Sequence, residues 1–127
     1  MTTRFDRGQD LVVVRATIWG PLEITVARLA LDTGATRSLL NESILRVIGY
    51  DTTGMLARTQ ITTGSGVEST PLVVLSRIAA LGKQKRKMAV ICHTLPPTAG
   101  VDGLLGLDFM RGQTLSIDFR RGRVSLR

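Results

Sequence analysis

The sequence predicts a single all-β domain from its length, its apolar residues and its turn signals. A chain of 127 residues has the size of one domain, and we expect one domain over residues 1–127 with its core at about 11–126. The apolar residues are mostly Leu, Val and Ile, with one Trp, one Tyr and three Phe. β-branched residues are frequent, and no long run of strong helix formers interrupts them.

Apolar segments and turn signals predict three hairpins joined by shorter elements. The first hairpin turns at Gly20-Pro21, and the second has a polar, glycine-rich tip at 63–66. One short helix is expected over 41–49 with Asn41 as its cap, and a second near Leu107. The expected strands cover residues 10–19, 22–31, 56–62, 67–75, 72–80, 87–92, 114–119 and 123–126.

The formal charge of +7 is a reason to consider a nucleic-acid partner. Much of this charge lies in two clusters, Lys83–Lys87 and Arg120–Arg123, which we interpret as solvated turns between strands. Neither cluster is interleaved with the aromatic residues that stack on bases. We therefore expect no specific nucleic-acid partner, and a basic nucleic-acid module remains the least favoured alternative function.

The single cysteine, Cys92, excludes an internal disulfide and a cysteine-based metal cage. With one histidine, His93, and no clustered carboxylates, we expect no metal and no cofactor. Adjacent residues of a strand point to opposite faces, so Cys92 and His93 do not predict a thiol protease pair.

The sequence contains no apolar run of membrane-spanning length, and its first residues contain no apolar signal core. We therefore expect no membrane segment in this chain. The default expectation is a cytoplasmic location, as a free protein or as a domain of a larger one.

An apolar strand that leads directly into Asp32-Thr33-Gly34 is the feature that points to chemistry. By itself the tripeptide also fits a surface turn, in which the carboxylate bonds to nearby backbone. Two carboxylates that share one proton can activate water and polarise a carbonyl group. The chain contains one Asp-Thr-Gly motif of this kind. Residues 51–54 and 62–64 are imperfect copies of it, and neither follows a comparable apolar strand.

Three elements in this order and spacing resemble the retropepsin-like aspartic proteases, the single-domain kind, and above all their bacterial members. They are the apolar strand with 32–36, the glycine-tipped hairpin about thirty residues later, and 104–106 before a helix. The likeness extends from about Val12 to Leu126. It implies a closed, barrel-like domain of the retropepsin type with a flap hairpin and one or two short helices. It also implies an aspartic endopeptidase that cleaves peptide or protein substrates.

The resemblance further implies a C2 homodimer in which Asp32 from each copy meets on the axis. Thr33 would lock the two loops together, and Gly34 would direct its amide at the carboxylates. The groove would be lined by Ala35 and Thr36. The flap residues implied are Thr63, Gly64, Ser65 and Gly66, and the residues implied to support the catalytic loop from below are Leu104, Leu105 and Gly106.

Two positions depart from the retroviral pattern. Retroviral enzymes have an aspartate in place of Thr36 and an arginine in place of Leu107, and these form an ion pair near the dimer interface. Both partners are replaced here, so no charge is stranded, and the dimer is expected to be weaker or differently built. We interpret Asp102 and Asp108 as turn or helix-start carboxylates. The alternative function is a catalytically silent relative that binds peptide or mediates assembly.

Overall fold

The structure, a computed structural model, describes residues 1–53 and 57–127 and is built mostly of β-strands. Two short helices, α1 (Glu42–Val47) and α2 (Leu107–Met110), and a 3₁₀ turn, η1 (Pro97–Ala99), join the strands of this described part. The strands are β1 (Thr2–Arg4), β2 (Val13–Trp19), β3 (Ile24–Leu31), β4 (Leu39–Asn41), β5 (Arg58–Thr63), β6 (Gly66–Ala80), β7 (Lys83–His93), β8 (Gly103–Leu105), β9 (Leu115–Asp118) and β10 (Arg123–Leu126). The expected fold class is confirmed.

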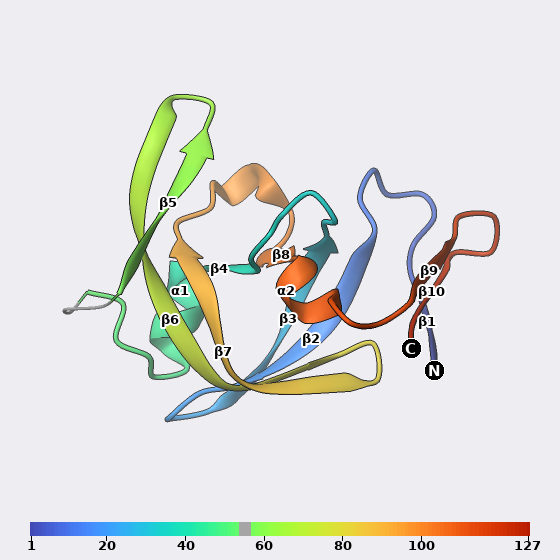
Figure 1. Ribbon diagram of the computed structural model, residues 1–127, viewed down its shortest axis with the longest axis horizontal. Helices are drawn as coiled ribbons and strands as arrows, with labels where there is room; N and C mark the ends of the chain where they lie inside the picture. Colours follow the sequence, from blue (N-terminus) through green and yellow to red (C-terminus); the bar gives the residue numbers. More distant parts are fainter. Residues whose placement is uncertain (54–56) are drawn as a thin grey trace.

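Six of the described strands close into a barrel. They follow the order β2-β3-β8-β4-β7-β6, and β2 also pairs with β6, which closes the ring. The pairs β3–β8 and β4–β7 are parallel. The long strand β6 continues beyond the barrel and pairs with β5, so that the β5–β6 hairpin projects from the body (Figure 1).

The core follows from the period-two pattern of the strands. In β2 the side chains of Val14, Ala16 and Ile18 are buried, and the intervening residues are not. In β3 the buried positions are Ala27, Leu29 and Ala30, whereas the apolar side chains of 22, 24 and 26 are exposed. The large side chains that are fully buried elsewhere are Leu40, Leu45, Ile48, Leu75, Ile78, Val90, Leu105, Phe109 and Leu126.

The interpretation of Lys83–Lys87 as a turn is wrong, because these residues open β7. Residues 67–75 and 72–80 likewise form one strand, β6, and β7 starts at Lys83 rather than Lys87. The turn lies at Leu81-Gly82, where φ is +55° and +76°. Once this left-handed turn is made there, the basic residues pair in register with the end of β6.

The expected cap of the first helix also differs. Asn41 precedes α1, but its side chain makes no capping bond, and its Oδ1 accepts a hydrogen bond from the Leu95 N–H (3.3 Å). Parallel pairing of Asn41 with His93 brings the two segments together. The strand β1 was not expected from the sequence, since three polar residues carry no periodic signal. Leu56, the expected start of the second hairpin, and Gly54 lie outside the described residues.

The two ends of the chain form a separate three-stranded sheet. Its order is β1-β10-β9, and the termini lie close together at one side of the molecule (Figure 1). The turn at 119–122 agrees with the expectation for the second basic cluster. There the Arg121 backbone N–H and guanidinium donate to Asp118, which lowers the pKa of that carboxyl group. Since β10 has a neighbour on each side, it is not a sheet edge.

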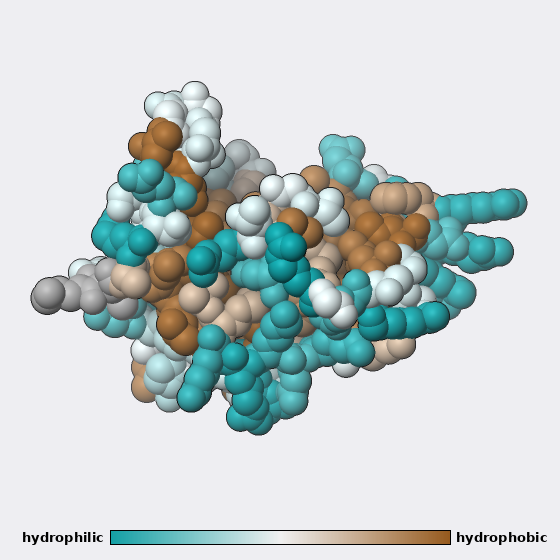
Figure 2. Space-filling view, viewed as in Figure 1, coloured by the Kyte–Doolittle hydropathy of each residue, from teal (hydrophilic) through white to brown (hydrophobic). Residues whose placement is uncertain are grey.

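Positive charges face one another across the barrel strands. Arg15 lies opposite Arg28, and Arg77 lies opposite Arg86. Arg77 stacks on the Trp19 ring at 4.1 Å and donates to Gln84 (2.7 Å). Hydrophilic side chains cover much of the lower and right-hand parts of the surface in Figure 2. No helix within residues 1–53 and 57–127 is long and apolar enough to cross a membrane.

Among the described glycines, Gly103 is the one at which an added Cβ would make the shortest contact. A Cβ there would lie 2.0 Å from the Leu39 carbonyl oxygen, because β8 is enclosed between β3 and β4. We expect Gly103→Ala to lower the free energy of unfolding by about 2 kcal/mol or more, measured by denaturant titration. Gly64→Ala is the control, since a Cβ at Gly64 meets nothing within 4 Å. Equal stability of the two variants would contradict this account of the barrel.

Candidate active site

Asp32 is presented at the point where two parallel strands end together. Leu31 of β3 pairs with Leu105 of β8, and the Asp32 N–H donates to the Leu105 carbonyl (2.9 Å). The Gly34 N–H donates to Asp32 Oδ1 (2.8 Å). Asp32 is half-buried, whereas Thr33 and Gly34 are exposed. The loop that carries them lies on the same side of the molecule as the β5–β6 hairpin (Figure 1).

The loop that follows Asp32 rests on the start of α2. The Ala35 carbonyl accepts a hydrogen bond from the Leu107 N–H (2.8 Å). Gly106 lies directly below, where a Cβ would be 2.7 Å from the Ala35 oxygen and 3.0 Å from the Arg37 carbonyl carbon. The close approach therefore requires glycine at this position. Leu105 and Gly106 thus contact the loop, and Leu104 lines the groove described below.

Ser38 joins the two halves of this arrangement. Its Oγ donates to Asp108 Oδ1 (2.7 Å) and accepts from the Gly106 N–H (2.9 Å). Its own N–H donates to Asp108 Oδ2 (2.8 Å). Ser38 is 1% exposed, so these bonds form away from bulk solvent. Asp108 lies in the first turn of α2, as expected, but Ser38 was missed because a lone serine after a turn carries no distinctive sequence signal.

The other carboxylates have local roles in the described structure. Asp102 accepts from the Arg28 N–H (2.8 Å) in the turn before β8, in line with its interpretation as a turn residue. In the imperfect copy at 51–54, Asp51 accepts from the Thr53 N–H (2.9 Å), and Thr52 donates to Glu42 (2.7 Å). That segment follows α1 and not a strand.

A groove of about 550 Å³ separates the Asp32 loop from the β5–β6 hairpin. Ala35, Thr36 and Thr63, expected from the sequence, line it together with Gly34. Asp32, Thr33 and the tip residues 64–66 are not among its lining residues. The remaining lining residues are Arg37, Leu39, Thr59, Gln60, Ile61, Thr62, Ile91, His93 and Leu104. Most of these were missed, because only the pairing of β4 with β7 and the position of β5 bring them together.

The hairpin tip is a tight turn stabilised by its own hydroxyl groups. Thr63 pairs with Gly66, leaving Gly64 and Ser65 between them. Thr63 Oγ1 accepts from the Ser65 N–H (3.3 Å) and donates to the Gly66 carbonyl (3.2 Å). Gly66 has φ +125°, a backbone conformation that favours glycine. The expected hairpin is therefore confirmed as an element, with an exposed tip.

Cys92 and His93 occupy different environments in β7. Cys92 is buried in the core, and His93 lines the groove. Burial raises the pKa of the Cys92 thiol, and the charge of Glu42 raises it further. A buried thiol with a raised pKa is a poor nucleophile.

Comparison with known proteins agrees with the resemblance found in the sequence. A family model described as aspartyl protease matches residues 14–109. The chain belongs to this aspartyl protease family. The matched range includes the Asp32 loop, the β5–β6 hairpin and the start of α2.

A solved structure shares the fold of this aspartyl protease family member. It is the crystal structure of a retropepsin-like aspartic protease from Rickettsia conorii, with a TM-score of 0.73 and 19% sequence identity. The alignment covers 99% of this chain and 88% of that one. The resemblance to bacterial retropepsin-like proteases is therefore confirmed at the level of family and fold. No curated protein sequence matches significantly.

Removal of the Ser38 hydroxyl should destabilise the site more than the loss of an ordinary surface serine. Ser38→Ala leaves a carboxylate oxygen of Asp108 and the Gly106 N–H without their partner, so we expect a loss of about 1–3 kcal/mol in unfolding free energy. Denaturant titration measures it, with the exposed Ser116→Ala as control. Indistinguishable stabilities would show that the bridge does not stabilise the site.

Cys92 should resist thiol reagents while the protein is folded. Thiolate is the reactive form, and the raised pKa together with burial keeps it scarce near pH 8. We expect modification by a disulfide reagent to be at least ~10-fold slower than in denaturant. A Ser116→Cys, Cys92→Ala variant supplies an exposed thiol as reference. Modification of native Cys92 at the rate of that exposed thiol would contradict its placement in the core.

Proposed function

We propose that the chain is an aspartic endopeptidase that becomes active as a homodimer. The observation that carries this proposal is the position of Asp32, at the end of β3 in the loop whose Gly34 and Ala35 line the groove, with one oxygen held by the Gly34 N–H. The groove is open and lies between the Asp32 loop and the β5–β6 hairpin. This shape suits an extended peptide. Family membership and fold support protease chemistry, and a chain with one Asp-Thr-Gly motif needs a second copy to form a carboxylate pair.

In this proposal the two Asp32 carboxyl groups share one proton, because two like charges so close together do not both ionise. The ionised carboxylate takes a proton from water while the water oxygen bonds to the scissile carbonyl carbon. The protonated carboxyl donates to the carbonyl oxygen, which gives a tetrahedral intermediate. Transfer of a proton to the amide nitrogen then breaks the C–N bond and releases a carboxylic acid and an amine.

The remaining residues have supporting roles in the proposal. Thr33 locks the two loops across the axis, and Gly34 directs its amide at the carboxylates. Ala35 and Thr36 contact the substrate. The hairpin tip closes over bound peptide and excludes water, and the loop is positioned from below. The tip residues are Thr63, Gly64, Ser65 and Gly66, and the positioning residues are Leu104, Leu105 and Gly106.

The proposed dimer relies more on the catalytic loops than on the C-terminal strand β10. Because β10 already pairs with β1 and β9, its two sides are occupied within one chain. Thr36 and Leu107 also offer no ion pair near the loop. We therefore expect weak association, and activity that depends on protein concentration.

Asp32→Asn should abolish cleavage of a mixed peptide library, since neither the base nor the shared proton remains. We expect at least a ~100-fold loss in rate across acidic to neutral pH. Wild-type activity should rise faster than linearly with concentration below the dimerisation constant. Glu23→Gln, which neutralises an exposed carboxylate on β2–β3, is the control, and thermal melting checks that Asp32→Asn folds.

Two results would overturn the proposal. Cleavage that Asp32→Asn leaves unchanged would come from a contaminant. Absence of cleavage by the wild type, when sedimentation shows a dimer, would favour the silent peptide-binding module.

A further inference from the structure

The groove beside Asp32 is lined by positive but not by negative side chains. Arg37 and His93 are its lining residues that can carry a positive charge. No Asp or Glu is among the described residues that line it. A substrate in this groove therefore meets the guanidinium cation of Arg37 close to the Asp32 loop.

The Arg37 side chain has no protein partner in the described part of the chain. It is half-buried, and the hydrogen bonds and ion pairs found there do not include its guanidinium. Asp108 is a nearby carboxylate, but its two oxygens accept hydrogen bonds from Ser38, the residue after Arg37. Asp32 accepts from Gly34. With no partner among the described residues, the N–H donors of its guanidinium are available to a bound anion.

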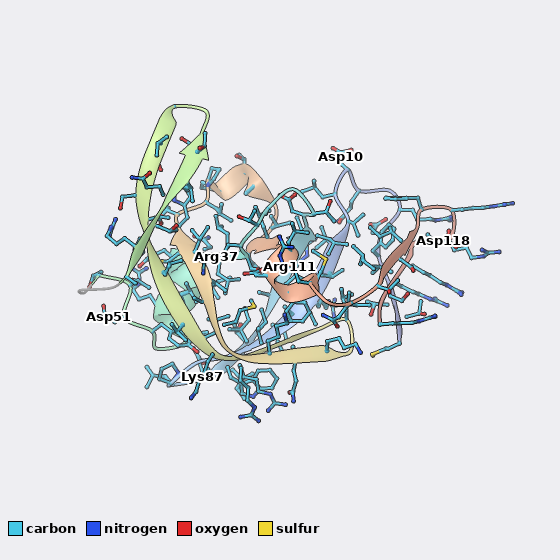
Figure 3. All side chains as sticks on the ribbon, in the orientation of Figure 1. Asp10, Arg37, Asp51, Lys87, Arg111 and Asp118 are labelled. Carbon is cyan, nitrogen blue, oxygen red and sulfur yellow. The ribbon has the colours of Figure 1, made fainter. Side chains whose placement is uncertain are left out.

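The backbone that carries Arg37 is firmly placed. A Cβ at Gly106 would lie 3.0 Å from the Arg37 carbonyl carbon, and Ser38 is fixed by Asp108. Figure 3 labels Arg37 in the middle of the molecule, between the β5–β6 hairpin and Arg111. This support fixes the point from which the Arg37 side chain leaves the backbone beside the groove.

We propose that Arg37 forms a subsite for an acidic side chain of the peptide substrate, with His93 as a second donor. The planar guanidinium pairs with a carboxylate through two parallel N–H···O bonds, a geometry that an amide cannot match. Thr59, Gln60 and Thr62 of β5 also line this groove. The inference rests on the proposed function, since it assigns a substrate class to the same groove.

The test uses two peptides that differ only by Glu or Gln beside the scissile bond, each with a blocked C-terminus. Cleavage is measured as kcat/KM, and binding is measured separately with reduced-bond versions that cannot be hydrolysed. We expect the wild type to prefer the Glu peptide at least ~10-fold in both assays. Arg37→Gln should remove the preference and Arg37→Lys should keep part of it. Arg86→Gln, which removes an exposed charge of β7, should leave it unchanged.

Each other outcome has a definite meaning. Equal binding of the Glu and Gln peptides by the wild type overturns the subsite, whether or not either is cleaved. A Glu preference that survives Arg37→Gln overturns the role of this residue. If an unblocked C-terminal carboxylate replaces Glu with full effect, the subsite recognises chain ends and the side-chain assignment is wrong. Selective binding without any cleavage would contradict the proposed function while leaving the anion preference of Arg37 in place.

Discussion

The hydrogen bonds of Ser38 hold together the parts of the molecule on which the site depends. The Ser38 side chain, just after the Asp32 loop, donates to Asp108 in α2 and accepts from the Gly106 N–H, which precedes α2. Through it, the loop that leaves β3 and the helix that follows β8 become one rigid unit. The parallel pairing of β3 with β8 brings these two chain segments to the same place, about seventy residues apart in sequence. Without these bonds, the loop that carries Asp32 would lose its link through Ser38 to α2.

The fold and the position of the Asp32 loop could be predicted from local sequence patterns, whereas the groove could not. Asp32-Thr33-Gly34 after an apolar strand and Gly106 before a helix are contiguous signals, and both have the expected place in the fold. The lining by Ile91, His93 and Arg37 depends on which strands become neighbours, and no short pattern encodes the parallel pairing of β4 with β7. The basic run at 83–87 was misinterpreted for a related reason. Charge suggests a turn, but the left-handed backbone at Leu81-Gly82 determines where the chain reverses.

The site lacks the Asp–Arg ion pair of the retroviral pattern and holds its loop by other hydrogen bonds. Thr36 and Leu107 carry no charge, and the carboxylate next to them, Asp108, is satisfied by Ser38. Arg37, a half-buried cation, lines the groove and makes no ion pair within the described part of the chain. In physical terms, the loop is anchored by neutral and charge-assisted hydrogen bonds, and none of them uses the positive charge of Arg37, which is therefore available for the role proposed above.

The facing arginines of the barrel strands repel one another, and the strength of this repulsion depends on the salt concentration. Arg15 opposite Arg28, and Arg77 opposite Arg86, repel one another across neighbouring strands. The two ion pairs found in the described part of the chain lie at exposed sites within α1 and next to β9. Counter-ions screen both the repulsion between the facing arginines and the attraction within these ion pairs. The strand pairing at these two positions is therefore sensitive to ionic strength, because salt weakens the repulsion between the facing guanidinium groups.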